Sequence, residues 1–228
     1  NFLLMLLFFL GIVGCKPTIP GKPKIIFIFA DDMSYNDLSG LGQQQFATPH
    51  IDELLQQDIF FREAYSGSSE CAPSRASLMT GFDMGRCRIR KNASIRGQDH
   101  LLDEDVTVAE MLKSAGYATG MVGKWGIGLP GTEGTPDKQG FDYSFGFYDQ
   151  SRAHGYYPHY LMENGEVVPI PENYGYDMER TYRHNRSDDG LHTYDEQGKL
   201  VPHGVQDPAA AKNSQDLIHS KALQFIRD

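Results

Sequence analysis

The sequence predicts an α/β protein in which a mostly parallel sheet is flanked by helices. The first observation is a nearly continuous apolar run from Lys24 to Ala30, whose β-branched and aromatic residues do not alternate with polar ones. Such a run is typical of a strand buried on both faces of a parallel sheet. The second observation is that expected strands and helices alternate along the 228 residues, which indicates an α/β sandwich.

The first half of the chain supplies a helix, a strand and a turn. A helix is expected from Pro49 to Gln57, because Thr48 can cap it and proline suits its first position. Ile59 to Ala64 is the next expected strand. Proline and serine at positions 73 and 74 favour a helix start, which puts Cys71 at a strand-to-helix turn. The amides at such a helix end attract anions.

The second half gives two clear elements and one long unassigned stretch. A helix is expected from Val106 to Ala115, ended by Gly116, and a strand from Tyr117 to Val122. Residues 130–207 are rich in Gly, Tyr, Asn, Asp and Pro, and no element is assigned there. Apolar residues at helical spacing predict a last helix from Ala209 to Arg227.

The N-terminal residues 1–15 are expected to be a lipoprotein signal peptide. Phe2 to Val13 is almost wholly apolar and short for a membrane span, as in a secretory signal. The ending Ile-Val-Gly-Cys resembles a bacterial lipobox, in which Cys15 would carry the lipid anchor; the alternative is an ordinary signal with an incidental cysteine. We expect a tether at 16–23, a folded domain at 24–228, and an exported lipoprotein in the periplasm or at the outer membrane or cell surface. The chain begins without Met, so we also expect the natural N-terminus to lie upstream.

The charge balance argues against nucleic-acid binding. The formal net charge is -9, whereas nucleic-acid affinity depends on neutralising phosphates. One basic cluster is a local exception, and it could attract a polyanionic glycan or form a solvated face paired with nearby carboxylates. Its members are Arg86, Arg88, Arg90, Lys91 and Arg96.

The most informative motif is Cys71-Ala72-Pro73-Ser74-Arg75, followed by an apolar pair and Thr80-Gly81. It resembles the signature of the type I sulfatases, which have the alkaline-phosphatase-like fold. The resemblance implies that a formylglycine-generating enzyme, or an anaerobic sulfatase-maturating enzyme, oxidises Cys71 to formylglycine. A disulfide between Cys71 and Cys87 is the alternative for an exported protein.

The resemblance also implies how Cys71 would act. A hydrated formylglycine carries two hydroxyls on one carbon, and one of them attacks sulfur and expels the alcohol. The second hydroxyl lets the sulfated adduct collapse, which releases sulfate and restores the aldehyde. A serine could perform the first step but could not eliminate sulfate.

Asp31 and Asp32 follow the first expected strand and are candidate metal ligands. Adjacent carboxylates can hold a hard divalent cation, although a strand-end aspartate pair is more often a turn or a helix cap. The family resemblance makes both of them, together with the residue derived from Cys71, ligands of Ca²⁺ or sometimes Mg²⁺. Such an ion is a Lewis acid toward nucleophile and sulfate oxygens.

Two basic residues complete the expected catalytic set. Arg75 lies four residues after Cys71, so a helix that starts near Pro73 would keep it close to Cys71, and the family uses this arginine to hold the formylglycine and balance charge. The segment from Gly116 to Trp125 resembles the second sulfatase signature, in which Lys124 corresponds to the lysine that binds sulfate. The alternatives are a surface arginine and a solvated lysine.

One position departs from the family pattern. Many sulfatases continue Lys-Trp-His, with the histidine near the nucleophile, but this chain has Gly126 after Trp125. His154, in a segment rich in His and Tyr, is the candidate replacement, and an ordinary loop histidine is the alternative.

The sequence therefore predicts the N-terminal part of a sulfuric ester hydrolase acting on an aryl sulfate or a sulfated carbohydrate. The family's remaining metal ligands lie in a later segment, so we expect the 228-residue chain alone to be inactive. Two alternatives stay open. One is a phosphodiester or phosphonate hydrolase of the same superfamily, and the other is a glycan-binding lipoprotein that lost catalysis through Gly126.

Overall fold

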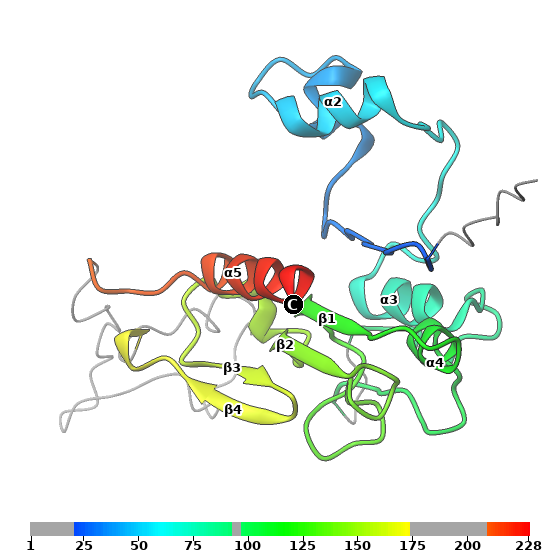
Figure 1. The fold of residues 1–228 in the computed structure, drawn as a ribbon, viewed down its shortest axis with the longest axis vertical. Helices are drawn as coiled ribbons and strands as arrows, with labels where there is room; N and C mark the ends of the chain where they lie inside the picture. Colours follow the sequence, from blue (N-terminus) through cyan, green and yellow to red (C-terminus); the bar gives the residue numbers. More distant parts are fainter. Residues whose placement is uncertain (1–20, 93–96, 174–208) are drawn as a thin grey trace, which may run out of the picture. The chain divides into compact units, whose positions relative to one another are not determined.

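The computed structural model describes residues 21–92, 97–173 and 209–228, which fall into two compact units, residues 1–60 and 61–228 (Figure 1). The expected signal peptide, Cys15, most of the tether and Arg96 lie outside the described residues. Of the helices in the described parts of the chain, none is both long and apolar enough to cross a bilayer.

The first unit is organised around one carboxylate. Two 3-10 turns, η1 (Tyr35–Asp37) and η2 (Ser39–Leu41), precede helix α2 (Pro49–Gln57), which has the predicted bounds, the N-cap Thr48 and proline in its first turn. Asp52 accepts hydrogen bonds from Ser39 Oγ, Gly40 N at 2.8 Å and Thr48 Oγ1 at 2.8 Å. The bond from Ser39 is the main cause that lowers the pKa of Asp52. This network ties η2 to the start of α2.

Two expected strands do not form. Residues 24–30 and 59–64 have no strand structure, and the side chain of Ile28 is 85% exposed. Apolar composition alone does not make a strand, because a strand also needs a neighbouring strand to bond its backbone. The described residues give neither segment such a neighbour, so both predictions are wrong for this structure.

The second unit is built on a mixed four-stranded sheet in the order β1 (Gly120–Lys124), β2 (Tyr143–Phe147), β3 (Tyr160–Glu163) and β4 (Glu166–Pro169). The pair β1–β2 is parallel, as predicted, whereas β2–β3 and β3–β4 are antiparallel. Gly146 (φ 139°) faces Gly123 in register, and a Cβ on Gly146 would lie 1.9 Å from Gly123 O. The two backbones therefore approach too closely for any other residue.

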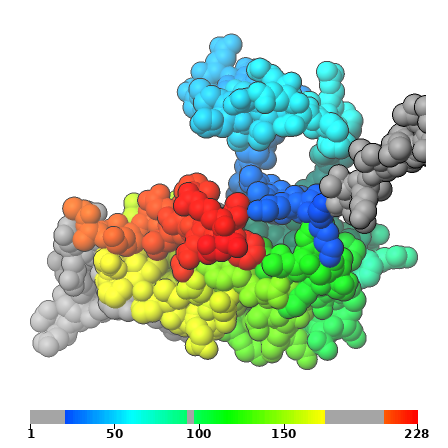
Figure 2. All heavy atoms as spheres, viewed as in Figure 1, coloured from blue at the N-terminus to red at the C-terminus, as the bar shows by residue number. Residues whose placement is uncertain are grey.

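Helix α5 (Ser214–Arg227) packs across β1 and β2 (Figure 1), and Figure 2 shows its red atoms against the green and yellow strand segments. Phe225 stacks on Tyr143 with ring centroids 5.6 Å apart, and Lys221 Nζ lies 2.6 Å from Glu163 Oε1. The predicted helix is confirmed, but it begins five residues later because Asn213 caps it by accepting from Gln215 N.

Helix α3 (Cys71–Thr80) is anchored in the main core. Ala72 and Ala76 are fully buried and pack in a cluster with Trp125, Ile127 and Tyr148. Helix α4 (Val108–Ser114) begins at a capping box, in which Thr107 Oγ1 accepts from Glu110 N at 3.2 Å and Glu110 Oε2 from Thr107 N at 2.7 Å. Both expected helices are confirmed.

The unassigned stretch contains local structure as well as strands β2 to β4. Two further 3-10 turns are η3 (Arg152–His154) and η4 (Pro171–Asn173). Asn173 is fully buried and its side chain bonds Pro158 O and both the N and O of Lys212. It therefore fixes the approach to α5.

Candidate functional site

The N-terminus of α3 presents Cys71 as its first helical residue. The next amide, Ala72 N, donates to Asn92 Oδ1 at 2.8 Å, and Asn92 N donates to Glu70 Oε2 at 2.9 Å. Glu70 is the N-cap residue, and its carbonyl accepts the first helical bond, from Ser74 N at 3.0 Å. Cys71 is therefore held at a helix start, as the sequence predicts, although no strand precedes it.

The loop before Cys71 is pressed against the same helix. A Cβ on Gly67 would lie 2.2 Å from Ser77 Oγ, so only glycine fits beside α3 there. Ser77 Oγ is itself committed, because it donates to Phe82 O at 2.7 Å beyond the helix end. The loop and both ends of the helix are thus tied together, which restricts how Cys71 can move.

Arg75 connects α3 to the end of β1. Its Nη1 donates to the carbonyl oxygen of Lys124, the last residue of that strand. Because Arg75 lies one turn after Cys71 on the same helix, this bond brings all three predicted residues to one region. The bond involves only the backbone carbonyl of Lys124 and not its side-chain ammonium.

The backbone around Lys124 is rigid. Lys124 pairs with Phe147 in the parallel register, and Trp125 N donates to Phe147 O at 2.8 Å. The buried Trp125 indole Nε1 donates to Gly134 O at 2.7 Å. The backbone at Lys124 is therefore held by strand pairing and by the buried indole of the next residue.

Asp31 and Asp32 belong to the first unit, and both are exposed. The backbone of Asp32 is left-handed, with φ 55°, a conformation that side chains of this kind adopt mainly in turns. The donor set fits the expected ion, because two adjacent carboxylates supply the hard oxygen ligands that Ca²⁺ and Mg²⁺ prefer.

His154 closes the turn η3 and is half-buried. Its backbone N donates to Ser151 O at 3.2 Å, and Asp149 Oδ1 caps the same turn by accepting from the amides of Ser151 and Arg152. The turn is therefore ordered. A catalytic role for His154 stays a prediction.

Sequence reasoning missed two residues of this region. Asn92 caps α3, and the side chain of Gln150 lies beside Gly126, where a Cβ would meet Gln150 Oε1 at 2.3 Å. The signal that could have found Gln150 is a polar pair, Asp149-Gln150, directly after the aromatic residues that end β2. No local pattern marks Asn92, because its partner is distant in sequence.

The two described cysteines differ in environment. Within the described residues neither Cys71 nor Cys87 takes part in a disulfide, which contradicts the disulfide alternative. Cys87 is buried in the core beneath α3, and burial raises the pKa of its thiol. Cys71 is half-buried at the helix end. Cys87 is therefore the less reactive thiol.

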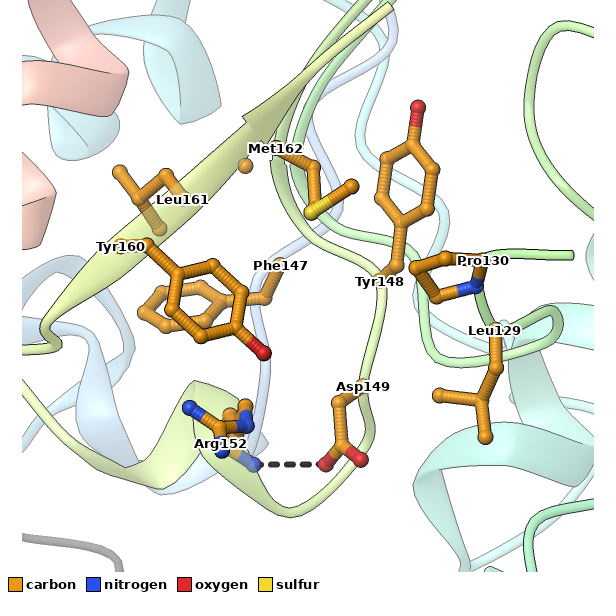
Figure 3. Close-up of a pocket in the computed structure, with 10 residues that line it drawn as sticks. Leu129, Pro130, Phe147, Tyr148, Asp149, Arg152, Tyr160, Leu161 and Met162 are labelled. Atoms are coloured by element: carbon orange, nitrogen blue, oxygen red, sulfur yellow. Dashed lines mark hydrogen bonds between the residues drawn. The ribbon is translucent and has the colours of Figure 1, made fainter. Parts of the chain in front are cut away.

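A small pocket lies beside β2 and β3 and is drawn in Figure 3. Phe147 and Tyr160 line it, together with Arg152, whose guanidinium lies 4.7 Å from the Tyr160 ring centroid. Arg152 N donates to Asp149 Oδ1 at 2.8 Å, the dashed line in the figure. The pocket is small, with a volume of about 70 Å³.

The described part of the basic cluster is partly neutralised. Arg88 forms ion pairs with Glu104 at 2.5 Å and Asp105 at 2.9 Å, and Arg90 donates to the carbonyl oxygens of Cys87 and Gly85. The ion pairs of Arg88 fit the alternative of a solvated face paired with carboxylates, whereas the bonds of Arg90 to carbonyl oxygens leave its charge in place.

Comparisons with known proteins point in one direction. A family model described as Sulfatase matches residues 23–224. An N-acetylgalactosamine-6-O-sulfatase of Bacteroides thetaiotaomicron is 42% identical over 164 residues, which cover 67% of this chain and 31% of that protein. The chain thus spans about a third of the length of this relative.

Solved structures agree with the sequence comparison. A structure from work on glycosaminoglycan metabolism by Bacteroides thetaiotaomicron is 39% identical, with a TM-score of 0.53 over 64% of this chain and 32% of that one. A second structure, solved with its substrate D-glucosamine-2-N,6-O-disulfate, is 28% identical, with a TM-score of 0.55 over 65% of this chain and 28% of that one. Both structures therefore share the fold of roughly two thirds of this chain.

Proposed function

The chain belongs to the sulfatase family, and we propose that the whole protein hydrolyses sulfate esters of carbohydrates. The observation that carries the proposal is the bond from Arg75 Nη1 to the Lys124 carbonyl, because it joins the two sulfatase signatures in space. The carbohydrate substrate is supported by a relative named for N-acetylgalactosamine 6-O-sulfate and a similar structure solved with a disulfated glucosamine.

Each residue has a chemical role in this proposal. Cys71, matured to formylglycine, supplies the nucleophile that attacks sulfur. Arg75 holds the nucleophile-bearing residue from one turn further along α3 and offsets negative charge there. Lys124 binds a sulfate oxygen, and the paired backbone around it fixes the point from which its side chain extends.

Asp31 and Asp32 are the proposed metal ligands, with Ca²⁺ as the first candidate and Mg²⁺ as the second. When bound, the ion supplies Lewis-acid stabilisation of oxygen charge. The two carboxylates supply adjacent oxygen ligands, and the backbone at Asp32 is left-handed, with φ 55°.

The nucleophile is tested by comparing the two described cysteines. In the whole protein, expressed with a maturation enzyme, Cys71→Ala is expected to lower kcat on an aryl sulfate by roughly a thousandfold or more, because no nucleophile remains. Cys87→Ala is the control, expected to reduce stability while kcat is retained. Intact-mass analysis of the Cys71 peptide should show replacement of the thiol by an aldehyde. An unmodified Cys71, or turnover by Cys71→Ala, would overturn the proposal, and faster turnover of an aryl phosphodiester would reassign the substrate.

The metal ligands are tested by calorimetric titration with Ca²⁺. Asp31→Asn and Asp32→Asn in the whole protein are each expected to weaken the Kd by roughly tenfold or more, because an amide oxygen carries no charge. The matched control is Asp58→Asn, an exposed aspartate of the same unit. Equal affinities for all three variants would exclude Asp31 and Asp32 as ligands.

A further inference from the structure

The place of the missing histidine is filled by another side chain. Gly126 has φ 73°, a left-handed conformation that disfavours most side chains. A Cβ at this position would lie 2.3 Å from Gln150 Oε1 and 3.6 Å from Arg75 Cδ. The amide of Gln150 therefore stands where a side chain at position 126 would begin, and the side chain of Arg75 borders the same space.

The amide of Gln150 is buried and unused. The residue is 3% exposed, and within the described parts of the chain neither Oε1 nor Nε2 has a hydrogen-bond partner. Its backbone is nevertheless fixed, because Gln150 N donates to Gln98 Oε1 at 2.6 Å and Gln98 Nε2 to Tyr148 O at 3.4 Å. The backbone of Gln150 is thus fixed, while its side-chain amide makes no hydrogen bond within the described residues.

Burying such an amide is unfavourable. Leaving one buried polar atom without a partner costs about 1–3 kcal/mol, whereas an apolar side chain of the same length avoids that cost. A residue that only filled space beside Gly126 would be more stable as methionine. The location next to Arg75 offers a use for the amide, since Oε1 is an acceptor and a guanidinium has five N–H donors, one of which goes to Lys124 O.

We propose that Gln150 replaces the family's histidine as a positioning residue: its amide, which has no hydrogen-bond partner in the described structure, accepts from the Arg75 guanidinium once substrate is bound and orients it at the nucleophile. The proposal rests on the proposed sulfatase function. A glutamine amide does not titrate and cannot transfer a proton, so Gln150 acts through Arg75 and leaves the acid–base steps to other groups. The pair Gly126 and Gln150 is then one unit, in which the small residue makes room for the amide.

Gln150→Met in the whole protein separates a positioning role from a structural one. We expect the melting temperature of the substrate-free protein to stay equal or rise, because the Gln150 amide has no hydrogen-bond partner to lose in the described structure. We expect kcat for a sulfate ester to fall by about a hundredfold with KM nearly unchanged, because a small misplacement of a catalytic group has that effect. Unchanged kcat, or a fall in kcat matched by a fall in melting temperature, would overturn the inference.

A swap provides the second test. Gly126→His alone should lower both the melting temperature and kcat, because its Cβ meets Gln150 Oε1. Adding Gln150→Ala removes that contact, and the double variant should regain stability and at least tenfold in kcat over Gly126→His. Additive losses would show that the two positions do not share one space and would refute the proposal. The wild-type assay separates the failures: an inactive wild type overturns the sulfatase function and this inference together, whereas an active wild type with additive losses overturns the inference alone.

Discussion

Two segments that the sequence predicts to be strands have opposite outcomes. The strand expected from Tyr117 to Val122 forms as β1 at residues 120–124, where it bonds in parallel register to β2 and is covered by α5. Residues 24–30 are more apolar in sequence, yet they form no strand and their large side chains are exposed. The less apolar segment forms the strand, because its neighbours β2 and α5 lie within the described residues.

The difference shows what an apolar run can and cannot predict. An apolar sequence indicates that a segment favours burial, whereas strand pairing requires a second backbone about 4.8 Å away and in register. For β1 that backbone is β2, only about twenty residues away, and Gly146 allows the close approach. For residues 24–30 the described residues supply no equivalent.

The largest expected effect is on the free energy of unfolding, compared between one isoleucine from each of the two regions. Ile127→Ala in the second unit should reduce the free energy of unfolding by about 2–5 kcal/mol, because Ile127 is fully buried in the core under α3. Ile28→Ala should change it by less than about 0.5 kcal/mol, since its side chain is 85% exposed. Urea denaturation of the 228-residue chain measures both. Equal losses would mean that residues 24–30 are packed in solution and that the contrast is not real.

Helices were predicted better than strands for a physical reason. The bonds and caps of a helix lie within a few residues, so Thr48-Pro49, Thr107-Glu110 and the spacing in α5 carried their own information. Strand β2 depends on the distant strand β1, and the Gly, Pro and Tyr content of its surroundings masked it. Strands β3 and β4 instead form a local hairpin closed by Asn164-Gly165, a turn signal that sequence reasoning overlooked. The α/β class was predicted correctly, but the antiparallel half of the sheet was not.

The second prediction concerns the helix that covers β1. Phe225→Ala is expected to cost about 2 kcal/mol, because the ring stacks on Tyr143 and fills the space over Gly120. Leu223→Ala on the same helix is the matched control and should cost less than about 1 kcal/mol, since Leu223 is exposed. Chemical denaturation compares them. If the two costs were equal, the covering of β1 by α5 would not explain why this strand is stable.

The sequence predicts those parts of the candidate site whose residues lie close together in one short motif. Cys71 and Arg75 are one helical turn apart, so their proximity follows from the sequence. The contact of Arg75 with the Lys124 carbonyl, the cap from Asn92 and the amide of Gln150 beside Gly126 are tertiary. They follow from how α3, β1 and the segment after β2 pack, and no local pattern encodes that packing.

The smallest effect concerns the ion pair that fastens α5 to the sheet. Burial acts to raise the pKa of Glu163, but hydrogen bonds from Lys221 at 2.6 Å and Tyr143 at 2.8 Å outweigh it and leave the pKa below its ordinary value. A carboxyl with a lowered pKa stabilises the fold above the pKa of the unfolded chain, about 4.3, and loses that contribution as the pH falls through the folded value. We therefore expect Glu163→Gln to lose roughly 0.5–1 kcal/mol of stability at pH 7 and little at pH 3.

The control for this prediction is Glu172→Gln, an exposed glutamate of the same unit, whose loss should be near zero at both pH values. Thermal unfolding at pH 7 and pH 3 measures the difference between the variants. A Glu163→Gln loss that is the same at both pH values would show that the carboxylate charge does not hold α5 on the sheet. The stacking of Phe225 on Tyr143 would then be the main attachment, and β1 would owe its cover to apolar contact alone.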